Sequence, residues 1–205
     1  IDMNYLVPAR VEAVSTKLDF TFKGHRSRRL EAMRKAIIAD DDRNTLICDL
    51  TIEEVRKEQS VAVLSNDIKH CKLLQELCAS RGCHGEVITS KVDKRLRKEL
   101  IARLIGGQLR LVFATSLLDE GIDIPRLSCV VQALPQSSRI KSAQKMGRIM
   151  RPYEGKAPKI IDIVDVRIPD LVNRWLKRKA AYKNFAATIY DEEVARKIRD
   201  YKVYA

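Results

Sequence analysis

Two segments of the chain combine hydroxyl, carboxylate and guanidinium groups at spacings that suit the binding of phosphate. The first covers residues 114–125, reads ATSLLDEGIDIP, and contains Thr115, Ser116, Gly121 and Asp123. Hydroxyl and backbone N–H groups that follow a strand are well placed to hold a phosphate. Glycine permits a turn or the close approach of a ligand. On spacing alone, an ordinary connection between a strand and a helix remains the alternative.

The second segment covers residues 144–151 and reads QKMGRIMR. Gln144, Arg148 and Arg151 stand at positions i, i+4 and i+7, which share one face of a helix. Two guanidiniums and an amide on one face form a fork for phosphate oxygens. Gly147 inside such a helix costs roughly 1 kcal/mol relative to alanine, which the close approach of a backbone or ligand would explain. A solvated basic face with an incidental glycine is the alternative.

Alternating strand and helix patterns surround both segments. Short apolar runs predict strands, and the stretches between them carry apolar residues three and four apart, which is typical of helices. This alternation favours a parallel sheet covered by helices on both faces, in which ligands gather beyond the carboxyl ends of the strands. We therefore expect binding groups just after residues 65, 89, 114 and 134. The predicted strands cover residues 61–64, 86–89, 109–114, 129–134 and 159–166.

The segments on either side of this region read differently. Residues 1–58 are predicted to be an extended lead-in followed by two packing helices, over 26–39 and 42–58. Residues 59–168 form the α/β core, and residues 169–205 are predicted to be basic helices. The first residue is Ile rather than Met, which indicates either a piece of a longer chain or a start at Met3 with two extra residues before it.

Composition limits the class of protein. The 205 residues carry a formal net charge of +12, which points to a polyanionic partner or an anionic substrate, or else to a merely soluble basic surface. Five scattered cysteines suit reduced thiols in a cytoplasmic protein. No apolar run is long enough to span a membrane, and the N-terminus does not resemble a signal peptide.

Several kinds of site are absent from the sequence. A P-loop needs G-x-x-x-x-G-K-[ST], but Gly155-Lys156 is followed by alanine and lacks the first glycine. No strand ends in adjacent carboxylates that would hold Mg²⁺. Cys78, Cys83 and His84 have the wrong spacing for a zinc site, so we predict no metal ligands.

Taken together, these segments resemble the conserved motifs of superfamily 2 helicases. Residues 114–125 resemble motif V (AT…EGxDxP), and residues 144–151 resemble motif VI (QxxGRxxR). Val61–Ser65 matches motif IV in position, and Ile88–Ser90 followed by Arg95 resembles the segment before motif V. Gly155-Lys156 and Ile161–Asp165 resemble the ending found in XPB-like and phage-type DNA helicases. The resemblance covers about residues 6–185, with departures at Lys145 and Ser90, where Arg and Gly are more usual.

The resemblance implies a second RecA-like lobe, a three-layer α/β sandwich with a mostly parallel sheet. It implies that Arg148 and Arg151 are arginine fingers on the γ-phosphate of ATP, near Gln144, and that Gly121 and Asp123 couple nucleotide to the lobe. ATP and Mg²⁺ would bind only together with a first lobe of the same polypeptide, so the isolated chain would be inactive. Phosphates of nucleic acid would lie at Thr115, Ser116, Ser65 and Ser90.

The resemblance also bears on the partner. Motif VI begins with Gln144 rather than the His usual in DEAD-box RNA helicases, which, with the ending at 155–165, favours DNA, as a single strand or duplex junction. An RNA helicase lobe and a non-catalytic nucleic-acid-binding module are the alternatives. The expected location is the cytoplasm or the nucleoid, with no membrane partner.

Overall fold

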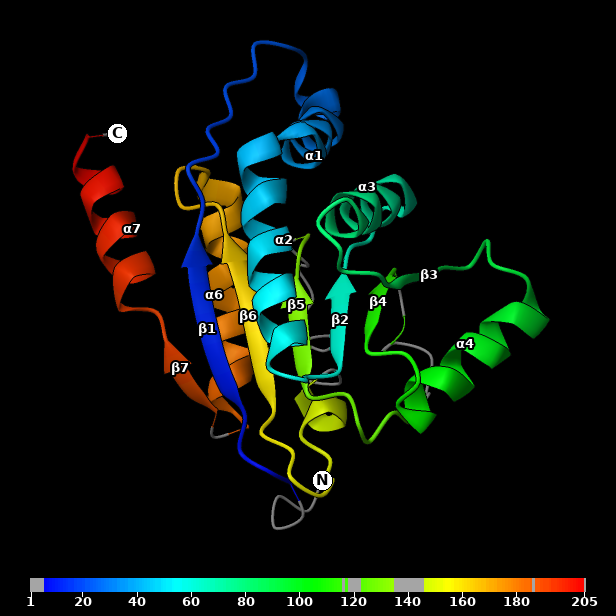
Figure 1. The fold of residues 1–205 in the computed structure, drawn as a ribbon. Helices are drawn as coiled ribbons and strands as arrows, with labels where there is room; N and C mark the ends of the chain where they lie inside the picture. Colours follow the sequence, from blue (N-terminus) through cyan, green and yellow to red (C-terminus); the bar gives the residue numbers. More distant parts are fainter. Residues whose placement is uncertain (1–5, 116, 118–122, 135–145, 186, 205) are drawn as a thin grey trace.

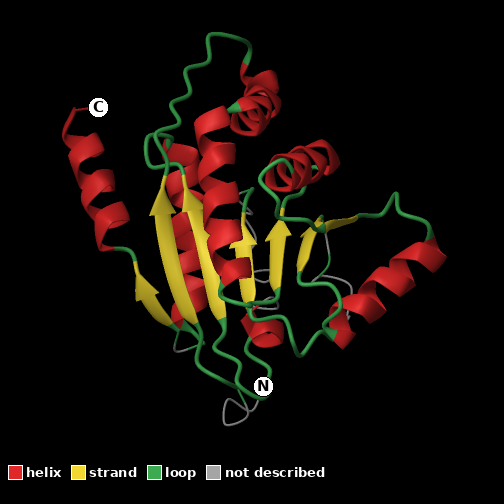
Figure 2. Cartoon of the chain, in the orientation of Figure 1, coloured by secondary structure: helices red, strands yellow, loops and turns green. Residues whose placement is uncertain are grey.

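The computed structural model describes residues 6–115, 117, 123–134, 146–185 and 187–204. Its centre is one sheet in the order β3-β4-β2-β5-β6-β1-β7, and every described pair of neighbouring strands is parallel (Figure 1). The arrows in Figure 2 accordingly point the same way. The strands are β1 (Arg10–Ser15), β2 (Val61–Leu64), β3 (Glu86–Ile88), β4 (Leu111–Ala114), β5 (Cys129–Gln132), β6 (Lys159–Val164) and β7 (Thr188–Tyr190).

Helices cover both faces of this sheet. In Figure 1, α2 lies in front of the sheet and α6 lies behind it. α2 and α3 pack on one face, while α4, α6 and α7 pack on the other. Their bounds are η2 (Arg26–Arg28), α1 (Arg29–Ala39), α2 (Asp41–Arg56), α3 (Ile68–Ala79), α4 (Lys94–Gly106), α6 (Pro169–Lys183) and α7 (Glu192–Tyr204). The RecA-like three-layer α/β fold expected from the sequence is confirmed.

The central strands are apolar along their whole length because both of their faces are covered. β2, β4 and β5 read VAVL, LVFA and CVVQ, and every residue in them is buried. Successive side chains point to opposite faces. Ala62 and Leu64 therefore join the core beneath α4 and α6, while Val61 and Val63 join the core beneath α2 and α3.

Local residues set the ends of α3 and α4. The Asp67 carboxylate accepts hydrogen bonds from the first backbone N–H groups of α3, at 2.7 and 3.1 Å. Asp93 caps α4 in the same way. Gly107 ends α4 with a φ of +80°, a left-handed conformation that glycine adopts without strain.

Two strands were not predicted from the sequence. β1 lies within the segment expected to be an extended lead-in, and β7 interrupts the helical tail between α6 and α7. Both flanking segments thus add a strand to the central sheet, although the division of the chain at residues 58 and 168 stays a prediction. The helix expected to reach Arg151 is observed over residues 146–149, and its earlier part lies outside the described residues.

All five cysteine thiols are free and buried. Within the described residues, no helix is long and apolar enough to cross a membrane.

Two buried carboxylates of the β6 segment join the sheet to its helices. Asp162 accepts two hydrogen bonds from the Arg178 guanidinium of α6, each at 2.7 Å, and a third from the Tyr182 hydroxyl at 2.7 Å. On the other face, Asp165 accepts a hydrogen bond from Arg43 Nε of α2 at 2.8 Å. These acidic and arginine side chains are at most 2% exposed.

Replacing Asp162 with asparagine should destabilise the fold strongly. The substitution leaves the buried Arg178 guanidinium without its counter-charge, which typically costs about 3–5 kcal/mol of unfolding free energy. Urea denaturation followed by circular dichroism measures the loss. Glu31→Gln, in the exposed Lys35–Glu31 pair, is the control and should leave the midpoint unchanged. Equal midpoints for Asp162→Asn and wild type would show that this ion pair does not hold α6.

Candidate functional site

Three of the residues predicted to contact nucleic acid lie along one edge of the sheet. Ser65 directly follows β2, Thr115 directly follows β4, and Ser90 stands two residues after β3. These strands are adjacent and parallel, so their carboxyl ends meet at one edge. The backbone N–H of Ser65 donates to the Ala114 carbonyl at 3.0 Å, which ties two of the strand exits together. Ser116, predicted beside Thr115, lies outside the described residues.

Ser65 itself is committed to the interior of the lobe. Its side chain is 1% exposed, and its hydroxyl lies 3.0 Å from His70 Nδ1 and accepts a hydrogen bond from the Asp67 N–H at 3.2 Å. The backbone N–H of Ser65 is also engaged, since it donates to the Ala114 carbonyl. Neither the hydroxyl nor the N–H of Ser65 therefore points to a bound nucleic-acid strand. These hydrogen bonds do not support the direct phosphate contact predicted for Ser65, and they give it a bracing role.

His70 is the centre of this brace and was not singled out from the sequence. Asn44 Nδ2 donates to the Ile38 carbonyl, so Asn44 Oδ1 is left as an acceptor for His70 Nε2–H at 2.9 Å. His70 Nδ1 therefore accepts from the Ser65 hydroxyl, which is the pattern of a neutral imidazole. Burial, together with the nearby charge of Arg43, lowers the pKa of His70 to about 3.

The turn after β3 presents Ser90 to solvent. Thr89 is buried, its carbonyl accepts a hydrogen bond from the Val92 N–H at 3.1 Å, and its hydroxyl lies 3.4 Å from the Lys91 N–H. This closed turn leaves Ser90 and Lys91 exposed. A hydroxyl and an ammonium therefore stand together at the edge where Thr115 lies, as a phosphate-binding edge requires.

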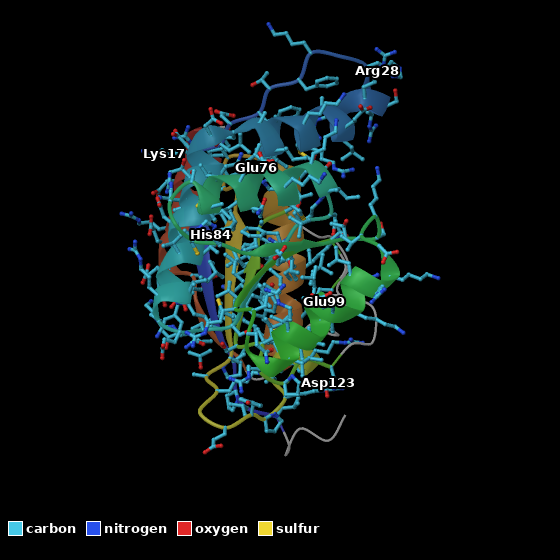
Figure 3. The ribbon with its side chains drawn as sticks, turned by 45° about the vertical axis from the view of Figure 1, so that its right-hand side comes forward. Lys17, Arg28, Glu76, His84, Glu99 and Asp123 are labelled. Carbon is cyan, nitrogen blue, oxygen red and sulfur yellow. The ribbon has the colours of Figure 1, made fainter. Side chains whose placement is uncertain are left out.

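A second group of predicted residues lies at the other end of the molecule. Asp123 Oδ2 and Arg151 Nη1 form an ion pair at 2.6 Å, with side chains 49% and 46% exposed. Figure 3 shows Asp123 at the lower end, far from Lys17 and Arg28 at the upper end. The sequence predicted that ligands gather at the carboxyl ends of the strands, but this pair lies toward their amino ends.

The helical residues 146–149 position the two arginines. Met146, Ile149 and Met150 are buried in the core, so this face of the helix is anchored. Arg148 is half-buried and Arg151 is exposed, three positions further on. Arg151 lies just beyond the helical residues, and its backbone N–H donates to the Arg148 carbonyl at 3.3 Å, so a turn joins the two arginines. Gln144, the third predicted member, lies outside the described residues, as does Gly121.

Among the described residues, Gly147 makes no close approach to another part of the chain. A Cβ at Gly147 would meet Phe185 at 3.9 Å, an ordinary van der Waals contact, and no nearer described atom. The described residues therefore do not by themselves require glycine at this position, and its close approach to a ligand stays a prediction.

Lys156 joins the two segments that carry the ion pair, and no role of its own was predicted for it. Its Nζ donates to the Pro125 carbonyl at 2.8 Å and to the Arg151 carbonyl at 3.0 Å. Burial lowers its pKa to about 8. The preceding Gly155 has a φ of +68°, which completes a turn that the Lys156 N–H closes onto the Tyr153 carbonyl at 3.0 Å. In the sequence, the Gly155-Lys156 dipeptide was the signal that could have pointed to this lysine.

Within the described ranges, no three His, Cys, Asp or Glu side chains are grouped as a metal site would require.

Comparison with known proteins decides the family. Residues 42–153, just over half of the chain, match the profile of the helicase conserved C-terminal domain. The chain belongs to this family. It is the C-terminal lobe of the superfamily 2 type, as the motif resemblance predicted.

Among curated relatives, the helicase C-terminal domain is similar to a putative helicase of a Sulfolobus islandicus filamentous virus, with 36% identity over 103 residues. It is also similar to the DNA 3'-5' translocase XPB2 of Sulfurisphaera tokodaii, with 31% identity over 78 residues. These matches cover 50% and 38% of this chain but 18% of each relative. The chain thus spans about a fifth of the length of the relatives it matches.

Solved structures agree on the fold. The domain matches T4 UvsW with a TM-score of 0.68 and 18% identity, over 90% of this chain and 40% of that one. It matches the C-terminal domain of the DEAD-box protein Dbp5 with a TM-score of 0.60 and 15% identity, over 96% and 99% of the two chains. At these identities the likeness establishes the fold alone.

The buried His70 predicts a loss of stability in mild acid. Its pKa is about 3 in the folded state and near 6.5 when unfolded, so between these values the unfolded chain binds more protons. The unfolding free energy should therefore fall as the pH falls below 6.5, by about 2 kcal/mol at pH 5 from this residue. Urea midpoints from pH 7 to pH 5 measure the slope.

His70→Gln keeps a polar side chain but removes this titration, and should flatten that slope. His84→Gln, at an exposed position, is the control and should keep it. An unchanged slope in His70→Gln would assign the acid sensitivity to other groups.

Proposed function

We propose that this chain is the second motor lobe of an ATP-dependent DNA helicase or translocase, in which it supplies arginine fingers to ATP and phosphate contacts to DNA. The observation that carries the proposal is the 2.6 Å pair of Asp123 and Arg151, because it brings motif V and motif VI together at the surface. Both side chains are about half exposed, so an incoming nucleotide can reach them.

Arg148 and Arg151 carry the catalytic part of the proposal. A guanidinium has five N–H donors in a planar fork, and Nη1 of Arg151 lies 2.6 Å from Asp123 Oδ2. Arg151 can therefore keep this contact while its other N–H groups face the γ-phosphate. Charge that develops on the transferring phosphoryl group is stabilised by such fixed donors.

The first lobe is needed to complete the site. Within the described residues, this lobe has no cluster of potential metal ligands, and its sequence has no P-loop. The proposal therefore leaves Mg²⁺ and the nucleotide cradle to a first lobe of the same polypeptide. When bound there, Mg²⁺ neutralises charge on the phosphates.

DNA is proposed to lie along the edge formed by Thr115, Ser90 and Lys91. Hydroxyl and ammonium groups there suit phosphate oxygens, and contacts of this kind depend on salt and little on sequence. The connection from β4 to β5 begins at Thr115 on this edge and reaches Asp123 at the other end of the lobe. One segment of chain thus runs between the proposed DNA contact and the proposed ATP contact, which is a direct route for coupling.

The choice of DNA over RNA rests on Gln144 and on the activities for which two relatives are named. XPB2 is named a DNA translocase, and the MPH1 protein of Debaryomyces hansenii, 33% identical over 81 residues, is named a DNA helicase. The RNA alternative is supported by the fold shared with Dbp5, which was solved with RNA and ADP BeF3. The proposed location is the cytoplasm or the nucleoid.

Alanine at either arginine should abolish ATP turnover in the full-length protein that contains this lobe. Arg148→Ala and Arg151→Ala each remove a donor to the transition state, so kcat should fall about 100-fold or more while nucleotide affinity largely survives. Steady-state phosphate release and binding of a fluorescent ATP analogue measure the two effects.

Arg199→Ala on α7, at an exposed position, is the matched control and should retain wild-type turnover. The 205-residue chain alone is expected to hydrolyse no ATP. Near-wild-type turnover in both finger variants, or turnover by the isolated chain that Arg148→Ala leaves unchanged, would refute the assignment.

The nucleic-acid preference is tested with matched strands. Single-stranded DNA should stimulate ATP turnover of the full-length protein more than RNA of the same sequence, and its affinity should fall linearly with salt on logarithmic axes. Greater stimulation by RNA would favour the RNA helicase alternative. Binding without any turnover would favour the non-catalytic module.

A further inference from the structure

Lys156 occupies an unusual position for a lysine. Its side chain is half-buried, and its ammonium group donates to two backbone carbonyls. Pro125 and Arg151, which provide these carbonyls, belong to the motif V segment and the motif VI segment. The ammonium group therefore bridges, through the backbone, the two segments whose side chains Asp123 and Arg151 also pair.

The local chain geometry fixes where this ammonium group lies. The turn closed by Lys156 N–H and the Tyr153 carbonyl needs the positive φ of Gly155. The turn places Lys156 beside residues that precede it by 5 and by 31 positions. Burial lowers the pKa of Lys156 to about 8. The ammonium group therefore loses part of its hydration when the bridge forms.

The Arg151 carbonyl is a suitable acceptor for a cation. It lies just beyond the helical residues 146–149, where backbone carbonyls have no partner within the helix and carry partial negative charge. An ammonium group there satisfies this acceptor and holds the Arg151 backbone. The Asp123–Arg151 ion pair alone is about half exposed, and such a pair fixes its long side chain only weakly.

We propose that Lys156 is a positioning residue for Arg151: it clamps the backbone of the motif VI segment to that of the motif V segment, and so holds the finger where the γ-phosphate arrives. This inference rests on the proposed function, since Arg151 must act on ATP for its position to matter. Lys156 itself would touch neither ATP nor DNA. A purely structural staple is the competing explanation, and it predicts loss of stability without a specific loss of turnover.

The first test uses the full-length protein and three variants. Lys156→Met removes the donors at similar length, Lys156→Arg retains donors, and Lys177→Met is the control at an exposed lysine of α6. We expect Lys156→Met to lower kcat about tenfold or more, with the KM for ATP and the affinity for DNA within about twofold of wild type. A group that orients a transition-state contact affects kcat rather than substrate binding. Lys156→Arg should recover most of the turnover.

Two results would overturn the proposal. One is a kcat of Lys156→Met within twofold of wild type. The other is an equal loss in Lys156→Met and Lys156→Arg together with a raised KM, because a structural defect of the lobe would affect binding as well and would not respond to the retained donors.

The second test uses the 205-residue chain and needs no catalysis. The Nε–Hε signal of Arg151 in a ¹⁵N NMR spectrum, assigned with Arg151→Lys, reports the environment of the guanidinium. Lys156→Met should move this signal toward its position in Asp123→Asn, while Lys177→Met should leave it in place. An unmoved signal in Lys156→Met would show that Lys156 does not position Arg151. Absence of ATP turnover in the full-length wild type would instead refute the proposed function, and this spectrum would still decide the role of Lys156.

Discussion

Buried charges must be compensated inside the protein, and the β6 segment carries two buried carboxylates. Asp162 points to one face of the sheet and Asp165 to the other, since residues of opposite parity in a strand face opposite sides. Each needs an arginine, which α6 supplies to Asp162 and α2 supplies to Asp165. Both helical layers are thereby fixed relative to one strand. The positions of the loops at the two ends of the sheet depend on this arrangement, because these loops connect the strands to the helices.

The same arrangement separates two kinds of surface. At the carboxyl edge of the sheet, the side chains of Ser65 and His70 make hydrogen bonds inside the fold. These contacts support the edge at which Thr115, Ser90 and Lys91 lie. At the opposite end, Asp123, Arg151 and Lys156 form a group held by backbone carbonyls as well as by charge. In the proposed function these two surfaces take ATP and DNA, and their separation would let each polyanion bind without displacing the other.

The sequence predicted what depends on local pattern. The apolar runs of β2 and β4 are local signals, and these predicted strands are confirmed. The Asp67 and Asp93 caps and the Gly107 stop are equally local features. β7 was missed because a strand of three residues, Thr188–Tyr190, forms only through its partner. β1 was missed because Val11 is the one fully buried residue of its six, so its apolar pattern is weak. The pairing of Asp123 with Arg151 required two segments to meet, which spacing does not reveal. The engagement of Ser65 and the bridge from Lys156 depend equally on distant partners.

The position of β1 has a consequence for the order of folding. β1 lies between β6 and β7, and Arg10 pairs with Lys159 on one side and Thr188 on the other. β1 can complete its pairing only after β6 and β7 have been synthesised, because contacts between residues far apart in sequence form late. β2, β4 and β5 can associate earlier, so β1 is inserted between β6 and β7 late in the assembly of this lobe.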